Sequence, residues 1–238
     1  MDLNHGGQGA PLASAFHAWR FSSPDEVRVV LNLGGIANIT ALIPDEPVTG
    51  FDTGPANSLM DAWCRTRWNR RYDDEGELAR KGTLLEELLS VLLKDDYFSA
   101  SPPKSTGFEH FNLGWVEAGI GQSRLAPADG DVLSTLTELT AITVSDAINA
   151  SVPNCERLIA CGGGAFNKFL TERLQNRLPQ CRVESSAAHG IAPEWVEAIA
   201  FAWLARRRTF NLSGNAPSVT GARQTAVLGG LYSAGSGD

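Results

Sequence analysis

Strand-type runs of apolar and β-branched residues, broken by glycine or proline turns, begin the regular part of the chain. Residues 27–33, 36–43 and 48–51 predict three β-strands in antiparallel order. Gly34 and Gly35 lie between the first two runs, and glycine supplies the positive φ that a tight hairpin turn requires. The pattern therefore predicts a β-hairpin followed by a third strand.

Further along the chain, apolar residues recur at helical spacing. This spacing predicts helices over residues 55–68, 77–93, 131–149, 165–177 and 193–208. A buried-type strand is expected at 157–161 and a short strand at 181–184. The segment 95–130 carries several turn signals and is expected to be irregular.

The resulting order is β-β-β-α-β-α-β-α with helical insertions. Antiparallel strands followed by βα units predict an α/β protein with a mixed sheet and helices on its faces. This layout resembles the ribonuclease-H-like lobe of actin-like and sugar-kinase ATPases. Residues 27–210 are expected to form that lobe, with an insertion at about 70–130 and a C-terminal tail over 211–238.

The composition of the chain limits the classes of binding partner that are expected. The 238 residues include 27 acidic and 20 basic side chains, for a formal charge of −7. This balance argues against nucleic acid or an anionic membrane as the main partner. The sequence shows no apolar run of membrane-spanning length and no secretory signal pattern. Four cysteines fit no zinc or redox spacing, so buried thiols in a reducing, cytoplasmic setting are expected.

Asp52 is the first candidate for chemistry. It is expected where the third strand ends and a helix opens, with Thr53 as the cap and Pro55 in the first turn. A helix N-terminus favours anions, and a carboxylate beside an anion site suits phosphoryl transfer. Asp52 is then a general base or a metal ligand. The alternative is an aspartate in an Asx-type turn before the helix.

Glu197 is the second candidate, because residues 196–205 are apolar on every side apart from this carboxylate. A helix that is apolar all round is expected to be buried, and a lone buried carboxylate is costly without a partner. This favours a ligand contact for Glu197. The alternative is that Glu197 marks the solvated end of the apolar stretch.

Two further motifs could contact phosphate. Gly162, Gly163 and Gly164 lie between a strand and a helix, where a glycine backbone can approach a ligand closely. The motif is neither a Walker A loop nor a complete GxGxxG, and plain turn geometry is the alternative. Lys104 lies in a PKSTG segment that is either a phosphate contact or an exposed turn. The four histidines show no metal-binding spacing.

Taken together, the motifs resemble one family, anhydro-N-acetylmuramic acid kinase. They follow in register along nearly the whole chain: GGQGAPL (6–12), LNLGGIANIT (31–40), GFDTGPANSLMDAW (50–63), PKSTGFEHFN (103–112), CGGGAFN (161–167), GIAPEWVEAIAFAWLA (190–205) and NAPSVTGA (215–222). The resemblance implies an ATP-dependent enzyme of peptidoglycan recycling. Such an enzyme opens 1,6-anhydro-N-acetylmuramic acid with water and phosphorylates O6 to give N-acetylmuramic acid 6-phosphate.

The resemblance also assigns roles to residues. It makes Asp52 the base that activates the attacking water, and it implies sugar contacts for Glu197, Gly7 and Gln8. It implies ATP with Mg²⁺ as cofactors, no protein metal ligand, a cytoplasmic enzyme and a homodimer. The residues expected along the nucleotide are Gly34, Gly35, Asn38, Gly54, Asn57, Lys104, Gly162, Gly163, Gly164 and Asn167.

One departure from the family pattern changes the expectation. Family members carry a GTSxDGxD phosphate loop in a separate first lobe, and this sequence shows no such loop. Residues 1–26 are then expected to be a remnant of that lobe, and the chain to be truncated with reduced or no activity. The alternatives are a non-catalytic lobe that binds a sugar or a partner chain, and a glycoside hydrolase with Asp52 and Glu197 as its carboxylate pair.

Overall fold

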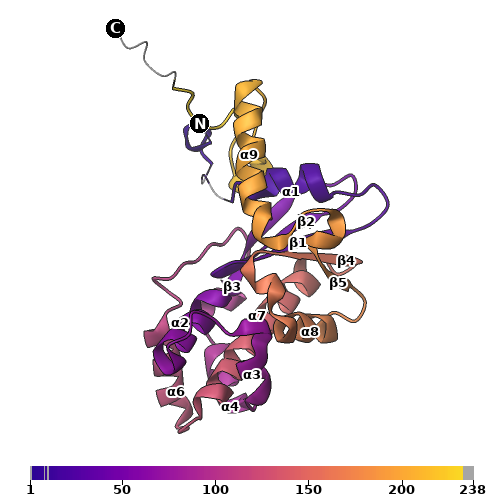
Figure 1. The fold of residues 1–238 in the computed structure, drawn as a ribbon. Helices are drawn as coiled ribbons and strands as arrows, with labels where there is room; N and C mark the ends of the chain where they lie inside the picture. Colours follow the sequence, from indigo (N-terminus) through magenta and orange to yellow (C-terminus); the bar gives the residue numbers. More distant parts are fainter. Residues whose placement is uncertain (1, 8, 10, 233–238) are drawn as a thin grey trace.

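The computed structural model describes residues 2–7, 9 and 11–232, and its centre is a five-stranded sheet with helices on both faces (Figure 1). The strand order is β3-β2-β1-β4-β5. The bounds are β1 (Arg28–Leu33), β2 (Ile36–Leu42), β3 (Thr49–Pro55), β4 (Arg157–Cys161) and β5 (Arg182–Ser185). β1 and β3 are antiparallel to β2, whereas β4 is parallel to both β1 and β5. The predicted α/β class and mixed, ribonuclease-H-like sheet are confirmed.

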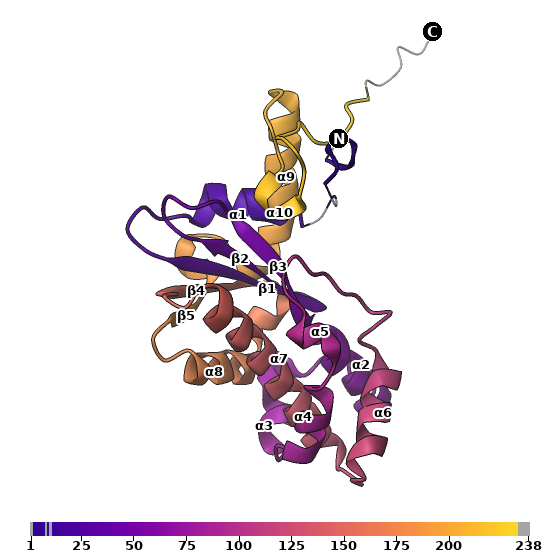
Figure 2. The ribbon, with the colours of Figure 1, turned by 180° about the vertical axis from the view of Figure 1, so that it is seen from behind.

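The larger core covers one face of the sheet. Alternate residues of β1, namely Val29, Leu31 and Leu33, point into it and are completely buried. The helices that close this face include α2 (Asn57–Trp68), α7 (Asp129–Ser151) and α8 (Lys168–Arg177). Figure 2 shows α7 and α8 beneath the strands, with α2 to α6 grouped beyond β3. The long helix α7 is almost entirely buried because it lies between the sheet and those helices.

A smaller core covers the opposite face, under α1 (Ala13–Phe21) and α9 (Val196–Thr209) (Figure 1). Val30 of β1 and Ile159 of β4 point to this side, against Phe16 and Trp203. The remaining described helices are short: α3 (Glu77–Lys81), α4 (Glu86–Leu92), α5 (Asp96–Ser99), α6 (Leu113–Ser123) and α10 (Pro217–Thr220). Single 3₁₀ turns are Leu3–His5, Asp74–Gly76, Gly163–Phe166, Ser186–His189 and Pro193–Trp195.

The insertion differs from the prediction. The expected helix over 77–93 is two helices, because the backbone becomes extended at Gly82. Glycine is needed there, since a Cβ would collide with the backbone of Gly130. The prediction of an irregular 95–130 segment is wrong, since it contains α5 and α6. Asn112 caps α6, with its side-chain oxygen accepting from the Trp115 N–H at 3.1 Å.

The third strand is longer than expected. It runs to Pro55, so Asp52 lies within the strand, and α2 begins only at Asn57. The predicted cap is wrong: Thr53 is buried, and its hydroxyl donates to the Ala37 carbonyl across the strand pair.

The two ends of the described chain pack together beside α9 (Figure 2). The Asp2 carboxylate is buried and accepts from the Asn215 amide at 2.7 Å, the Thr220 hydroxyl at 2.9 Å and the Gly9 N–H at 2.9 Å. Residues of the N-terminal segment and of the C-terminal tail therefore form one local unit. The division at residues 26 and 210 stays a prediction.

Candidate active site

A row of polar side chains crosses four strands of the sheet. Asp52 of β3 is paired with Asn38 of β2, Asn38 with Asn32 of β1, and Asn32 with Cys161 of β4. Residues paired across strands point to the same face, and neighbouring strands lie about 4.8 Å apart. Cys161 packs in the smaller core, so the whole row faces the side of α1 and α9. Asp52, Asn38 and Asn32 are half-buried, which leaves them accessible to a ligand.

Asn32 was not among the predicted site residues, although the sequence contained its signal. In the run VRVVLNL, alternation places residue 32 on the face of Val30, where an apolar residue would complete the strand. Its side chain lies between the glycine turn and the hairpin: a Cβ at Gly162 would be 2.7 Å from Asn32 Oδ1, and one at Gly34 would be 3.6 Å from Asn32 Nδ2. Asn32 therefore connects the polar row to both glycine motifs.

Asp52 is fixed by a segment more than forty residues away in sequence. Its Oδ2 accepts from the Thr106 N–H at 3.1 Å, its own N–H donates to the Lys104 carbonyl at 3.2 Å, and its carbonyl accepts from the Tyr97 hydroxyl at 2.7 Å. Burial raises the pKa of Asp52, and the Thr106 N–H offsets part of that rise. A carboxylate with a raised pKa is a better proton acceptor near neutral pH.

Tyr97 and Thr106 were also missing from the prediction. Thr106 belongs to the PKSTG motif, but only the fold shows that its backbone meets Asp52. The buried Thr106 hydroxyl has no hydrogen-bond partner among the described residues. Tyr97 lies in the segment that was expected to be irregular, and its sequence context carried no signal.

Lys104 is engaged within the protein. Its ammonium donates to the Tyr97 carbonyl at 3.0 Å and to the Phe98 carbonyl at 3.2 Å, and burial lowers its pKa. These contacts fix the segment that holds Asp52. The predicted nucleotide contact of Lys104 therefore gains no support from its geometry.

A cavity of about 130 Å³ lies at Asp52. Four motifs that are far apart in the sequence line it: Pro11 from GGQGAPL, Asp52 from GFDTG, Ser105 from PKSTG and Val219 from NAPSVTG. A larger cavity of about 370 Å³ is lined by Phe51 and Thr53. These two side chains alternate with Asp52 along β3, so the larger cavity lies on the other face of the strand.

Of the two predicted sugar contacts in GGQGAPL, Gly7 lies within the described residues. Gly7 is buried, and a Cβ there would collide with the Asp2 carboxylate, so its backbone packs closely against the local unit at the chain ends. Gln8 lies outside the described residues.

The two glycine motifs meet beside Asn57. Its amide donates to the Leu33 carbonyl at 2.8 Å, and a Cβ at Gly164 would lie 2.7 Å from Leu33 Cβ. Gly162 has φ +78°, which also requires glycine. Among the described residues, the hydrogen bonds include none donated by the amides of Gly34, Gly35, Gly163 or Gly164. These N–H groups suit the oxygens of a phosphate chain.

The expected anion site at the start of α2 is wrong. The N–H groups of Ala56 and Ser58 donate to the Gly35 carbonyl, and that of Asn57 donates to the Gly34 carbonyl, at 3.0–3.1 Å. The hairpin therefore satisfies the N–H groups of these three residues, which are not free to bind an anion.

Two other predicted nucleotide contacts have structural roles. A Cβ at Gly54 would lie 2.8 Å from the Phe98 ring, so this glycine permits close packing of α5. The Asn167 side chain caps α8 by accepting from the Leu170 N–H at 2.9 Å.

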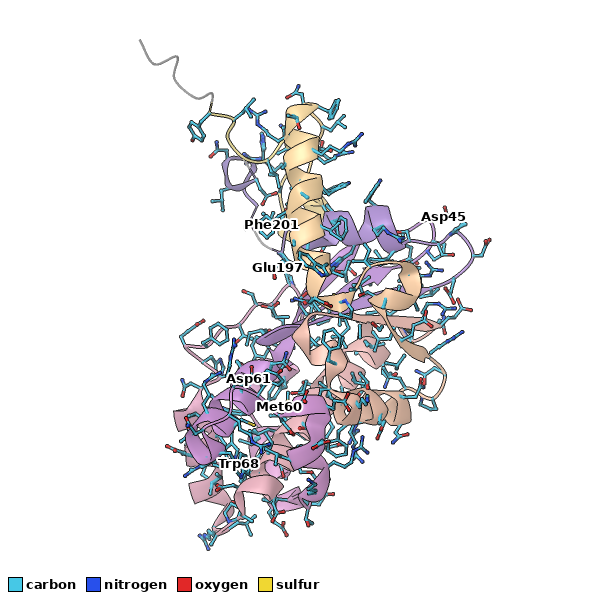
Figure 3. All side chains as sticks on the ribbon, in the orientation of Figure 1. Asp45, Met60, Asp61, Trp68, Glu197 and Phe201 are labelled. Carbon is cyan, nitrogen blue, oxygen red and sulfur yellow. The ribbon has the colours of Figure 1, made fainter. Side chains whose placement is uncertain are left out.

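Glu197 is exposed, which corrects the prediction of a buried carboxylate. Only the stripe of Val196, Ala200 and Trp203 packs inward, because α9 lies on the surface of the sheet and not between layers. Figure 3 shows Glu197 on the turn of α9 nearest the sheet, with Phe201 one turn further out. Burial and the nearby Glu197 carboxylate raise the pKa of Cys161 to about 12. Glu197 therefore lies near the Cys161 end of the polar row.

The described residues offer neither a metal-binding cluster nor a membrane-spanning helix. Residues 2–7, 9 and 11–232 contain no group of three or more His, Cys, Asp or Glu side chains arranged to hold a metal ion. Within the same part of the chain, no helix combines the length and apolar character needed to cross a bilayer.

Comparison with known sequences shows which proteins this chain is similar to. The model of the family described as "Anhydro-N-acetylmuramic acid kinase" matches residues 1–234. The chain belongs to the anhydro-N-acetylmuramic acid kinase family. It is 52% identical over 231 residues to the anhydro-N-acetylmuramic acid kinase of Saccharophagus degradans, covering 97% of this chain and 62% of that protein. The corresponding kinase of Pseudomonas paraeruginosa is 46% identical over 233 residues, covering 98% and 64%.

The present chain therefore spans slightly less than two thirds of the length of these two kinases. Among solved structures, component A of (R)-2-hydroxyglutaryl-CoA dehydratase from Acidaminococcus fermentans is similar, with a TM-score of 0.50 and 15% identity over 79% of this chain and 64% of that one. At this identity the similarity concerns the fold alone.

Proposed function

We propose that the protein containing this chain is an ATP-dependent anhydro-sugar kinase. It adds water across the 1,6-anhydro bond of anhydro-N-acetylmuramic acid and phosphorylates O6, in the recycling of peptidoglycan fragments. The observation that carries the proposal is the half-buried Asp52, held by Thr106 in a cavity where four family motifs converge.

Asp52 is the proposed general base. Its carboxylate takes a proton from water while the water oxygen bonds to the anomeric carbon. The bond from that carbon to O6 breaks as the new bond forms, and its electron pair stays on O6. O6 attacks the γ-phosphorus of ATP, and ADP leaves. The raised pKa of Asp52 and its single N–H donor leave the carboxylate able to accept a proton.

The glycine motifs are the proposed nucleotide side of the site. The free N–H groups of Gly34, Gly35, Gly163 and Gly164 fit the charge of a triphosphate, since a neutral backbone can approach it closely. Asn38 and Asn32 extend this side toward Asp52. Mg²⁺ bound to ATP would supply further charge neutralisation at the transferring phosphoryl group.

Glu197 is the proposed sugar contact near the end of the polar row that lies away from Asp52. Its exposure leaves the carboxylate accessible to a ligand. Gly7 and Gln8 remain proposed sugar contacts through their motif. A cytoplasmic homodimer is proposed from the family, and sedimentation of the purified protein tests the dimer.

The test is the reaction itself, with the product of the complete gene that encodes this chain. Incubation with ATP–Mg²⁺ and 1,6-anhydro-N-acetylmuramic acid is expected to give ADP and N-acetylmuramic acid 6-phosphate in equal amounts. Sugar opening without ATP consumption would indicate a hydrolase. Sugar binding in calorimetry without ATP binding or turnover would indicate a non-catalytic lobe. Either result overturns the proposal.

A further inference from the structure

The four cysteines are free and buried, as predicted, but two of them are in contact. Cys155 Sγ lies 2.9 Å from Cys181 Sγ, and each residue is only 1% exposed. Among the hydrogen bonds of the described residues, none joins Cys64 or Cys161 to another sulfur. The contact between Cys155 and Cys181 has no part in the proposed reaction.

Cys155 and Cys181 lie just before two adjacent strands and are offset by one position in their register. Cys155 ends the turn after α7, and Cys181 ends the turn after α8, where their N–H groups donate at 3.0 Å to Val152 and Leu178. The next residues are joined directly, since the Arg182 N–H donates to the Glu156 carbonyl at 2.9 Å. Strands β4 and β5 then continue side by side in parallel.

This arrangement meets the geometric requirement of a disulfide. Neighbouring strands lie about 4.8 Å apart, and disulfides span Cα separations of roughly 4.4–6.8 Å. The sulfur atoms already point at each other. A bond between them requires a small approach of the sulfurs and no rearrangement of the strands.

We propose that Cys155 and Cys181 form a reversible dithiol–disulfide pair whose oxidant is a small-molecule disulfide such as oxidised glutathione. One cysteine thiolate attacks a sulfur of the oxidant and releases one glutathione thiol. The other cysteine then attacks the mixed disulfide and releases the second. The protein loses two electrons and two protons, and two glutathione thiols are formed.

The shared contact favours the thiolate of Cys155 over that of Cys181. The contact with the Cys181 thiol lowers the pKa of Cys155, while the same contact, with burial, raises the pKa of Cys181. Exchange requires the thiolate, so the first step falls to the cysteine with the lower pKa.

Access to the pair comes from the sheet edge. β5 is an edge strand of four residues, none of them fully buried, and Arg182 at its start is exposed. Both thiols pack at the margin of the larger core, and local opening of this short edge is the proposed route by which they become exposed. Oxidation is therefore slow in the closed structure and accelerated by conditions that loosen the edge.

The disulfide encloses β4, the glycine turn at 162–164 and α8 in one covalent loop. Closing a loop restricts the unfolded chain and so stabilises the folded one. The oxidised form is expected to melt several degrees above the reduced form.

The test is a redox titration of the purified protein. It is equilibrated in mixtures of reduced and oxidised glutathione, with and without subdenaturing urea, then acid-quenched, unfolded and alkylated. Mass spectrometry is expected to show loss of two alkylation sites in oxidising mixtures, with residues 155 and 181 in one cross-linked peptide. Dithiothreitol is expected to restore four sites and reverse the rise in Tm.

Matched variants complete the test. Cys64→Ser removes a buried thiol without a sulfur partner and is expected to retain the disulfide. Cys155→Ser is expected to lose both the cross-link and the shift in Tm. Four free thiols in every mixture, including those with urea, or a cross-link between another pair, would overturn the proposal. Peptide mapping of the parent protein gives this answer even if Cys155→Ser fails to fold.

Discussion

The backbone N–H of Thr106 donates to the Asp52 carboxylate at 3.1 Å, across 54 residues of sequence. This contact links the PKSTG motif to the strand that carries the proposed base. The Lys104 carbonyl of the same segment accepts from the Asp52 N–H, and the Lys104 ammonium anchors the segment. The segment therefore fixes the position of Asp52 and, through the Thr106 N–H, offsets part of the rise in its pKa that burial causes.

Removing that N–H tests its role. Thr106→Pro deletes the donor, whereas Thr106→Ala keeps it and serves as the control. Loss of the hydrogen bond is expected to raise the pKa of Asp52 further, because the donor stabilises the charged form. In the complete gene product, the acidic limb of the pH–rate profile is expected to move to higher pH in Thr106→Pro only. Equal profiles for the two variants would show that the contact does not tune Asp52.

The glycine turn offers a pair of substitutions that separate folding from nucleotide binding. A Cβ at Gly163 meets only the Asn57 amide nitrogen at 3.9 Å, whereas one at Gly164 would lie 2.7 Å from Leu33. Gly163→Ala is expected to keep the Tm of the parent but to weaken ATP binding about tenfold, a loss of about 1.4 kcal/mol. Gly164→Ala is expected to lower the Tm.

Calorimetry with ATP–Mg²⁺ and thermal melts check both substitutions. Unchanged ATP affinity in Gly163→Ala would place the phosphates away from this turn.

His17 is expected to make folding sensitive to acid. It is buried between α1 and the sheet, with Nδ1 2.9 Å from the Thr40 hydroxyl, and burial lowers its pKa from 6.5 to about 4. Below pH 6.5 the unfolded chain takes up a proton that the folded protein does not. The free energy of unfolding therefore falls by about 3 kcal/mol between pH 6.5 and pH 4 on account of this residue.

Urea denaturation of the parent and His17→Asn at several pH values measures that contribution. Burial raises the pKa of Asp61 to about 6, despite the opposing charge of Arg65. Protonation of Asp61 therefore increases the free energy of unfolding over the same pH range in which His17 decreases it. Only the difference between the two proteins therefore isolates His17. The difference is expected to shrink as the pH falls from 6.5 to 4, and a constant difference would contradict the prediction.

The strands were predictable because successive side chains of a strand point to opposite faces of the sheet, and this alternation is visible in the sequence. Val29 and Leu31 point to one core and Val30 to the other, as the run of residues 27–33 implies. The helix α6 was missed because Gly114, Gly119 and Gly121 lower its intrinsic propensity. Packing explains one of them, since a Cβ at Gly119 would lie 2.6 Å from Leu92.

The candidate site shows the limits of sequence patterns more clearly. Asp52 was identified, but its place inside β3 was not, because the register shift beside Asn38 depends on the pairing of β2 and β3. Glu197 was expected to be buried because its helix is apolar all round. Whether such a helix is covered depends on its partners, and Trp195 and Phe201 are 59% and 61% exposed. The contact of Thr106 with Asp52 is tertiary and leaves no trace in local spacing.

The most direct test of the proposed chemistry is Asp52→Asn in the complete gene product. The side chain keeps its size and its place in β3 but loses the carboxylate. Turnover of 1,6-anhydro-N-acetylmuramic acid with ATP–Mg²⁺ is expected to fall by about 10²–10⁴-fold, with sugar and ATP affinities within a few-fold of the parent. A variant that retains more than about a tenth of the parental turnover would contradict the role of Asp52 as the general base.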